Sequence, residues 1–364
     1  MKLLHVVGAR PNFPKLAPVY RAGQAANLAQ VVVHTGQHYD ELLSDSFFVE
    51  LEIPRPDVNL EVGSETHAVQ TARVMERVEP IVMREHPDWI LVYGDVNSTV
   101  AAALVGAKLG VRIAHVEAGL RSHDRTMPEE INRIVTDRLA DLLLTPSHDA
   151  DAVLRAEGEP EEEIVFVGNV MIDTLLHCVP RARQSGFAER IGANGSTVVV
   201  TLHRPSNVDD PARLRAIGHA LRHIAQERPV IFPAHPRTAR RLAEMGVNLT
   251  PVRVLPPVSY LEMLSLLEGA YAVVTDSGGI QEETTVLGVP CLTVRENTER
   301  PITVSQGTNR LVPDPTLLPD LVRTLARPGL VVRPDGWDGK AAERIIQALL
   351  DRRASAARSA PPVA

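Results

Sequence analysis

The stretch WILVYGDVNSTVAAALVGAKLGVRIAHVEAGLR, residues 89–121, decides the predicted fold. Apolar runs at 89–93 and 112–116 flank a segment of helical composition that begins at Asn97, which is the strand–helix–strand rhythm of a parallel sheet. The same rhythm predicts further strands at 3–8, 30–35, 141–145 and 163–168, and then at 196–202, 229–234, 270–275 and 290–294. We therefore predict an α/β protein.

Length and composition limit the possible classes. A chain of 364 residues exceeds one ordinary core, and the polar stretch 178–196 separates the two strand series, so two domains are expected with the hinge in or just before that stretch. The net charge of −7 disfavours nucleic-acid and acidic-membrane partners. The absence of a run of ~18 apolar residues disfavours a membrane span, and two cysteines without partners at metal spacing disfavour a zinc site. We expect a soluble, cytoplasmic protein without a metal.

Two carboxylates follow neighbouring predicted strands at equivalent positions. Asp95 comes after strand 89–93 and Glu117 after strand 112–116, and a right-handed crossover would place the two strand ends side by side, ~4.8 Å apart. Like charges at that distance drive pKa values apart and prepare one acid and one base. The structural alternative is that Asp95 caps the next helix and Glu117 pairs with Arg121.

Cations lie at two other strand ends. In VVGARPNFPKLAP (6–18), Arg10 and Lys15 flank a glycine turn before a helix, which suits a diphosphate, although a plain surface turn is the alternative. In TLHRPSNVDDP (201–211), His203 and Arg204 stand at the end of the second series' first strand. A histidine there is either structural or part of a site.

The stretch VTDSGGIQEE (274–283) is the most specific of these motifs. A buried strand ends at Thr275, and Asp276, Ser277, Gly278 and Gly279 then expose backbone N–H groups at the start of a helix, which can hold a phosphate. Glu283, one turn later, can accept hydrogen bonds from ribose hydroxyls. The alternative is a glycine turn with exposed glutamates.

The motifs together resemble a known family. GARPNFPKLAP, HTGQHYD, GDVNST, HVEAGLR, MPEEINR, VGNVMIDTL, TLHRPSNVDDP, DSGGIQEE and TERPITVSQGTNR occur in the order seen in non-hydrolysing UDP-N-acetylglucosamine 2-epimerases, over about residues 1–350. The resemblance implies a glycosyltransferase-B-like architecture, with two Rossmann-like parallel-sheet domains facing a cleft. One domain would span 1–172, with sugar and catalytic carboxylates and a returning helix at about 338–353, and the UDP-binding domain would span 173–337.

The resemblance also implies an activity. The family interconverts UDP-N-acetylglucosamine and UDP-N-acetylmannosamine without cofactor, usually as a homodimer, by anti elimination of UDP to 2-acetamidoglucal and syn re-addition. By motif position the catalytic residues are Asp95, Glu117, Glu129 and His203. The substrate-binding residues are Arg10, Lys15, Arg133, Arg204, Ser277, Gly278, Gly279 and Glu283.

Some roles and the exact sugar stay open. Glu117 and Glu129 are expected to serve the sugar, while one or more of Arg121, Arg125 and Arg133 neutralise the cluster and reach the leaving phosphate. The alternative activities are epimerisation of UDP-2,3-diacetamido-2,3-dideoxyglucuronate and glycosyl transfer from a UDP-sugar donor. The stretch QHYDELL (37–43) differs from the segment linked in some members to substrate activation, so we do not expect that activation.

Overall fold

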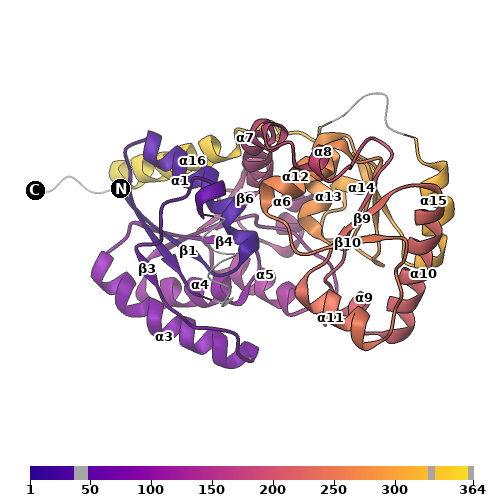
Figure 1. Cartoon of the computed structure of the whole chain (residues 1–364). Coiled ribbons are helices and arrows are strands. Elements are labelled where there is room, and N and C mark those ends of the chain that lie inside the picture. Colours follow the sequence, from indigo (N-terminus) through magenta and orange to yellow (C-terminus); the bar gives the residue numbers. More distant parts are fainter. Residues whose placement is uncertain (37–47, 327–332, 360–364) are drawn as a thin grey trace, which may run out of the picture. The chain divides into compact units, whose positions relative to one another are not determined.

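The computed structural model describes residues 1–36, 48–326 and 333–359, without the side chains of Arg10 and 353–359, and the chain forms two compact units (Figure 1). Unit 1 comprises Met1–Thr174 and Asp335–Ala364, and unit 2 comprises Leu175–Pro334. The first division falls inside helix α7 (Val170–Gln184). The polar stretch that begins at residue 178 therefore starts as helix.

Unit 1 is built on a seven-stranded parallel sheet in the order β3-β2-β1-β4-β5-β6-β7. Its strands are β1 (Lys2–Val7), β2 (Ala29–His34), β3 (Val58–Asn59), β4 (Trp89–Tyr93), β5 (Arg112–Val116), β6 (Leu142–Thr145) and β7 (Ile164–Phe166). The predictions at 89–93 and 112–116 are confirmed residue for residue. The two-residue edge strand β3 was not predicted, because it lacks an apolar run.

Helices pack around the sheet of unit 1. They are η1 (Arg10–Asn12), α1 (Phe13–Ala25), α3 (His67–Glu85), α4 (Asn97–Leu109), α5 (Pro128–Leu139), α6 (His148–Glu157) and α16 (Ala341–Ser359). On one side α1 packs against α16, while α3, α4 and α5 neighbour one another on the other side (Figure 1). Asp173 of α7 fixes the start of α16, since its carboxylate accepts the N–H groups of Ala341 and Ala342 at 3.1 and 2.8 Å.

Unit 2 has a six-stranded parallel sheet in the order β10-β9-β8-β11-β12-β13. Its strands are β8 (Val198–Thr201), β9 (Val230–Pro233), β10 (Arg253–Leu255), β11 (Ala272–Thr275), β12 (Cys291–Thr293) and β13 (Asn309–Leu311). Its helices are α8 (Phe187–Arg190), α9 (Pro205–Val208), α10 (Pro211–Glu227), α11 (Pro236–Glu244), α12 (Tyr260–Gly269), α13 (Gly278–Leu287), α14 (Ile302–Ser305), η2 (Pro315–Leu317) and α15 (Leu318–Thr324).

Each unit has its own apolar core, which explains the fold. Strands of a parallel sheet are covered by helices on both faces, so the central strands β4 and β8 read as continuous apolar runs in the sequence. Local signals set the helix ends: Pro128 opens α5 with Glu129 and Glu130 in its first turn, and Gly110, at φ +68°, ends α4. The prediction of two parallel-sheet α/β domains is confirmed.

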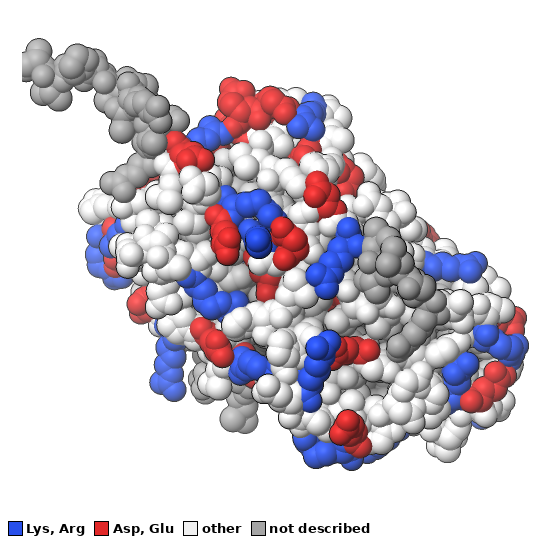
Figure 2. All heavy atoms as spheres, turned by 90° about the horizontal axis from the view of Figure 1, so that it is seen from above, with Lys and Arg blue, Asp and Glu red and all other residues white. Residues whose placement is uncertain are grey.

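Two further features are the distribution of charges on the surface and the composition of the helices. On the face drawn in Figure 2, acidic and basic side chains lie interspersed instead of forming one patch of a single sign. Among the helices of the described residues, none is both long enough and apolar enough to cross a membrane.

Candidate active site

The strand order of each sheet creates one point where ligands commonly bind. Successive connections run in opposite directions from the centre of the sheet, between β1 and β4 in unit 1 and between β8 and β11 in unit 2. Open α/β sheets hold ligands beyond the carboxyl ends of the strands at such a point. Asp95 follows β4, and His203 and Ser277 follow β8 and β11, so these predicted residues lie at the expected edges.

In unit 1, Lys15 and Glu117 form a buried ion pair. The Nζ of Lys15, on α1, bonds to Oε2 of Glu117, and both residues are less than a tenth exposed. Glu117 directly follows β5 at φ +77°, a left-handed conformation that costs a non-glycine residue on the order of 1–2 kcal/mol. Its N–H bonds to the carbonyl oxygen of Leu144 at 3.0 Å, which holds this conformation. The structure thus stores backbone strain at a predicted catalytic residue.

The Lys15–Glu117 pair needs a glycine beside it. Gly94, which directly follows β4, has φ +63°, and a Cβ on it would lie 2.6 Å from the Nζ of Lys15 and 3.3 Å from Oε2 of Glu117. Asn12 also fixes this turn by donating from Nδ2 to the carbonyl oxygen of Tyr93 at 2.8 Å. The requirement for Gly94 and Asn12 was not predicted from the sequence.

The alternative pairing of Glu117 with Arg121 is wrong. Arg121 is buried and its guanidinium bonds instead to Asp137 and to Glu157, each at 2.7 Å. The reason is spatial, since the chain turns after Glu117 and carries Arg121 towards α5 and the end of α6, while α1 brings Lys15 to Glu117. Arg121 therefore holds the loop that follows β5 inside unit 1.

A second ion-paired group joins Asp95, Arg133 and Glu130. The Nη1 of Arg133 bonds to Oδ2 of Asp95, and its Nη2 lies 2.6 Å from Oε2 of Glu130. Asp95 does not cap α4, because the N-cap residue is Val96 and makes no side-chain cap. The side chain of Asp95 remains 30% exposed. This carboxylate therefore combines a cationic partner with access to solvent.

The two adjacent glutamates of α5 lie in different environments. Glu130 is buried and accepts the backbone N–H groups of Ser122 and His123, each at 2.9 Å, while Glu129 is exposed. Burial alone would raise the pKa of Glu130, but these N–H groups and Arg133 hold it below its usual value. Glu130 therefore anchors the loop 117–127, and the exposed Glu129 is the one that a ligand can reach.

The buried His115 of β5 connects the turn after β4 with helix α5. In His115, Nδ1 lies 2.6 Å from Oδ1 of Asp137 and Nε2 lies 2.8 Å from the carbonyl oxygen of Gly94, while Gly119 donates its N–H to Asp137 at 3.1 Å. Burial would raise the pKa of Asp137, but His115 and Arg121 outweigh that effect and lower it. Sequence reasoning missed this network. Its signal was a histidine within the apolar strand β5, facing a helix that carries an aspartate.

In unit 2, His203 is held by a buried carboxylate. Asp276, which follows β11, is fully buried, and its Oδ1 lies 3.0 Å from Nδ1 of His203. The carboxylate also accepts the backbone N–H of His203 at 3.1 Å, that of Arg204 at 3.0 Å and Nδ2 of Asn207 at 3.0 Å. The His203 side chain itself is 50% exposed. Asp276 and Asn207 were not among the predicted site residues.

Three guanidinium groups gather around one carboxylate near the start of α13. Glu299 is bonded to Arg300 at 2.7 Å, to Arg295 at 2.7 Å and to Arg204 at 3.3 Å. Burial would raise the pKa of Glu299, but the arginines hold it far below its usual value. Arg300 also pairs with Glu282 at 2.8 Å, and the carboxylate of Asp276 lies near Arg204, so carboxylates balance the three guanidinium groups.

The first turn of α13 lies directly against this cationic cluster. Ser277 is the N-cap residue, and Ser277, Gly278 and Gly279 are partly exposed. A Cβ on Gly278 would lie 2.5 Å from Nη1 of Arg300, so a larger residue there would displace this guanidinium group. Helix N–H groups beside several guanidinium groups suit an anion such as a phosphate.

Glu283 lies inside unit 2 as a neutral acid. It is 3% exposed and accepts the hydroxyl of Tyr260 at 2.9 Å. Burial raises its pKa to about 8. The prediction that it receives ribose hydroxyls stays a prediction.

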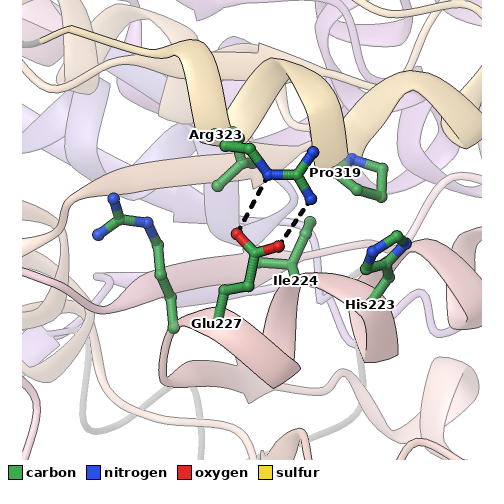
Figure 3. A pocket seen from close by; sticks show the side chains of 7 residues that line it. His223, Ile224, Glu227, Pro319 and Arg323 are labelled. Atoms are coloured by element: carbon green, nitrogen blue, oxygen red, sulfur yellow. Dashed lines mark hydrogen bonds and ion pairs between the residues drawn. The ribbon is translucent and has the colours of Figure 1, made fainter.

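Some predicted residues lie outside the described part of the chain or apart from these groups. The side chain of Arg10 and the stretch 37–43 lie outside what the structure describes, and Arg125 is exposed. A surface pocket between α10 and α15 contains none of the predicted residues, and in it Glu227 and Arg323 point towards each other and pair at 2.6 Å (Figure 3). Within the described ranges, no group of three His, Cys, Asp or Glu side chains is arranged for a metal.

Comparison with known proteins shows which family the sequence of this chain resembles. The family model described as UDP-N-acetylglucosamine 2-epimerase matches residues 21–350. A UDP-N-acetylglucosamine 2-epimerase of Methanocaldococcus jannaschii is 40% identical over 96% of this chain and 99% of its own. A UDP-2,3-diacetamido-2,3-dideoxy-D-glucuronate 2-epimerase of Pseudomonas aeruginosa is 42% identical over the same shares.

A solved structure is similar over nearly the whole length. It is the M. jannaschii UDP-GlcNAc 2-epimerase in complex with UDP-GlcNAc and UDP, with a TM-score of 0.88 and 38% identity over 96% of this chain and 100% of that one. A match of this extent spans nearly all of this chain and all of the other. The chain therefore belongs to the UDP-N-acetylglucosamine 2-epimerase family.

Proposed function

We propose that this protein interconverts UDP-N-acetylglucosamine and UDP-N-acetylmannosamine by non-hydrolysing elimination and re-addition of UDP. The observation that carries the proposal is the group of carboxylates with cationic partners at one edge of the unit 1 sheet, Glu117 with Lys15 and Asp95 with Arg133. Support comes from the M. jannaschii relative, whose structure contains UDP-GlcNAc and UDP.

The chemistry requires more than one carboxylate. The C2 hydrogen of the sugar is too weakly acidic for direct removal, so departure of UDP from C1 must first develop positive charge on the ring. The electron pair of the C1–O bond leaves with the β-phosphate, and one carboxylate takes the C2 proton as the C1–C2 double bond forms. The others stabilise the charge on the ring. Asp95, Glu117 and the exposed Glu129 are the candidates, and syn re-addition of UDP completes the inversion.

Unit 2 would hold the nucleotide. The first turn of α13 with Ser277, Gly278 and Gly279, together with Arg204 of the cationic cluster, would bind the diphosphate. Glu283 would receive the ribose. In unit 1, Arg133 and Lys15 would complete the charge balance around the leaving group, with Arg10 by motif position.

A second candidate substrate is UDP-2,3-diacetamido-2,3-dideoxyglucuronate. It is favoured by the P. aeruginosa relative, which is as similar as the M. jannaschii one. This sugar adds a carboxylate and a second acetamido group, so the elimination chemistry at C1 and C2 is unchanged.

The test is proton NMR in D₂O with each sugar nucleotide in turn. We expect deuterium to enter C2 of UDP-N-acetylglucosamine while UDP-N-acetylmannosamine accumulates to equilibrium. Exchange only with the diacetamido sugar would move the assignment to the second substrate. Free N-acetylmannosamine with stoichiometric UDP would mean hydrolysis and would overturn the proposal.

A further inference from the structure

The fold fixes the hydrogen-bond partner of one ring nitrogen of His203. Its Nδ1 lies 3.0 Å from Oδ1 of the fully buried Asp276, and a carboxylate can only accept a hydrogen bond. The proton of the ring must therefore sit on Nδ1. The other nitrogen, Nε2, belongs to a side chain that is half exposed, so it is the one available to a ligand.

Asp276 is itself held in one orientation. Its Oδ2 accepts the backbone N–H of Arg204 and Nδ2 of Asn207, each at 3.0 Å, and Asn207 is anchored in turn by donating to the carbonyl oxygen of Val294 at 3.0 Å. The carboxylate therefore cannot rotate without losing these bonds. Oδ1 stays directed at His203.

We propose that Asp276 is a positioning residue that fixes the proton of His203 on Nδ1 and so presents Nε2 to the β-phosphate of the substrate, and this inference rests on the proposed function. A neutral ring in this tautomer offers a lone pair at Nε2. When an anionic phosphate approaches, the ring lies between two anions, which favours the doubly protonated form. Nε2–H then donates to the phosphate oxygen that receives the electron pair of the breaking C1–O bond.

The second proton enters Nε2 from solvent as the anionic substrate binds, and no proton changes hands at His203 in the elimination itself. UDP leaves with the C1–O electron pair, and the C2 proton goes to a carboxylate, so the balance is complete. The hydrogen bond from Nε2 stabilises the charge that appears on the β-phosphate, and it retains UDP for the return addition.

An asparagine at position 276 should reverse the tautomer. In Asp276→Asn, the amide oxygen is required on the Oδ2 side, where Arg204 and Asn207 both donate. The amide N–H₂ would then face His203, whose Nδ1 must accept and whose proton must move to Nε2. The variant ring can therefore still donate from Nε2, but only as a neutral group and without the carboxylate that supports a charged ring in wild type.

The first test reads the tautomer directly. Long-range ¹H–¹⁵N correlation spectra of the full chain with ¹⁵N-labelled histidine are recorded for wild type and Asp276→Asn, and His203→Gln identifies the signals of His203. We expect Nδ1–H in wild type and Nε2–H in Asp276→Asn. An Nε2–H tautomer in wild type would overturn the proposal even if the variant failed to fold.

The second test asks whether Asp276 acts through His203. We expect Asp276→Asn to lower kcat about 10²-fold with a small change in KM, and His203→Gln to do the same. The double variant should be no slower than His203→Gln alone. A further equal loss in the double variant would show a purely structural role and would refute the proposal.

A matched control uses another aspartate of unit 2. Asp209 pairs on the surface with Arg237 and with Arg241, so Asp209→Asn should leave kcat and the His203 spectrum unchanged. If wild type shows no C2 exchange with either sugar nucleotide, the proposed function fails, while the tautomer result stands by itself.

Discussion

The Nζ of Lys15, on the first helix, bonds to Oε2 of Glu117, the residue that directly follows the central strand β5. Both side chains are buried, and Glu117 holds a left-handed backbone conformation. A cation was expected at the diphosphate and a carboxylate at the sugar, and the fold joins the two before any ligand binds. The pair therefore neutralises two buried charges at the end of β5.

Removal of Lys15 should destabilise the protein more than removal of a surface lysine. Lys15→Met leaves Glu117 buried without this partner, so we expect a loss of about 3 kcal/mol in urea unfolding. Lys2→Met breaks the partly exposed pair with Glu85 and should cost under about 1 kcal/mol. Adding Glu117→Gln to Lys15→Met should restore much of the stability. Equal losses for Lys2 and Lys15 would contradict the buried pair.

Gly94 should be required for activity because of its neighbours and not only because of its φ. Gly94→Ala places a Cβ 2.6 Å from the Nζ of Lys15, so we expect kcat to fall at least about 10-fold, together with a loss of stability. Gly110 has a similar φ of +68°, but an added Cβ there meets nothing within 4 Å. Gly110→Ala should therefore lose stability alone. Equal kcat for the two variants would argue against the steric explanation.

Substitutions of the adjacent Glu129 and Glu130 should have different effects, one on catalysis and the other on stability. Glu129→Gln changes an exposed side chain, so we expect kcat to fall about 10²-fold with an unchanged Tm. Glu130→Gln disrupts the anchor of Ser122, His123 and Arg133, so we expect a clear drop in Tm. Thermal unfolding and epimerase assays on both variants check this. The reverse pattern would exchange the two roles.

Stability should fall with rising pH because of Glu283. Its pKa is raised by burial from the ordinary 4.5 to about 8, so the folded state binds a proton that the unfolded state has released. The contribution is fully present below pH 4.5 and is lost as pH rises through about 8. Asp173 has the same sign with a pKa of about 6, burial lowers the pKa of His5 from 6.5, and hydrogen bonds to carboxylates raise the pKa of His148. Between pH 6 and 8 the contribution of Glu283 is therefore the difference between wild type and a Glu283 variant.

Glu283→Gln should flatten the dependence of unfolding free energy on pH in that window. The exposed Glu189→Gln of the same unit serves as the control and should keep the wild-type slope. Urea unfolding at pH 6, 7 and 8 measures it. An unchanged slope in Glu283→Gln would show that another group titrates.

The sequence was sufficient for the sheets because their strands are buried on both faces. Runs such as WILVY at 89–93 and RIAHV at 112–116 have no other stable placement, and the turns and helices between them enforce parallel order. The edge strands β3, β10 and β13 were missed, since pairing along one side gives two or three residues no apolar signature. The family was also identified from motifs, and the match over residues 21–350 confirms it.

By itself the sequence determined the α/β fold, the family and the strand ends at which Asp95, Glu117, His203 and Ser277 lie. Only the tertiary structure decided the partners: Lys15 for Glu117, Asp137 and Glu157 for Arg121, and Asp276 for His203. The physical reason is that strand and helix signals are local in the chain, whereas an ion pair forms between whichever charges the folded backbone brings within a few ångströms. Burial of those charges then makes the choice energetically decisive.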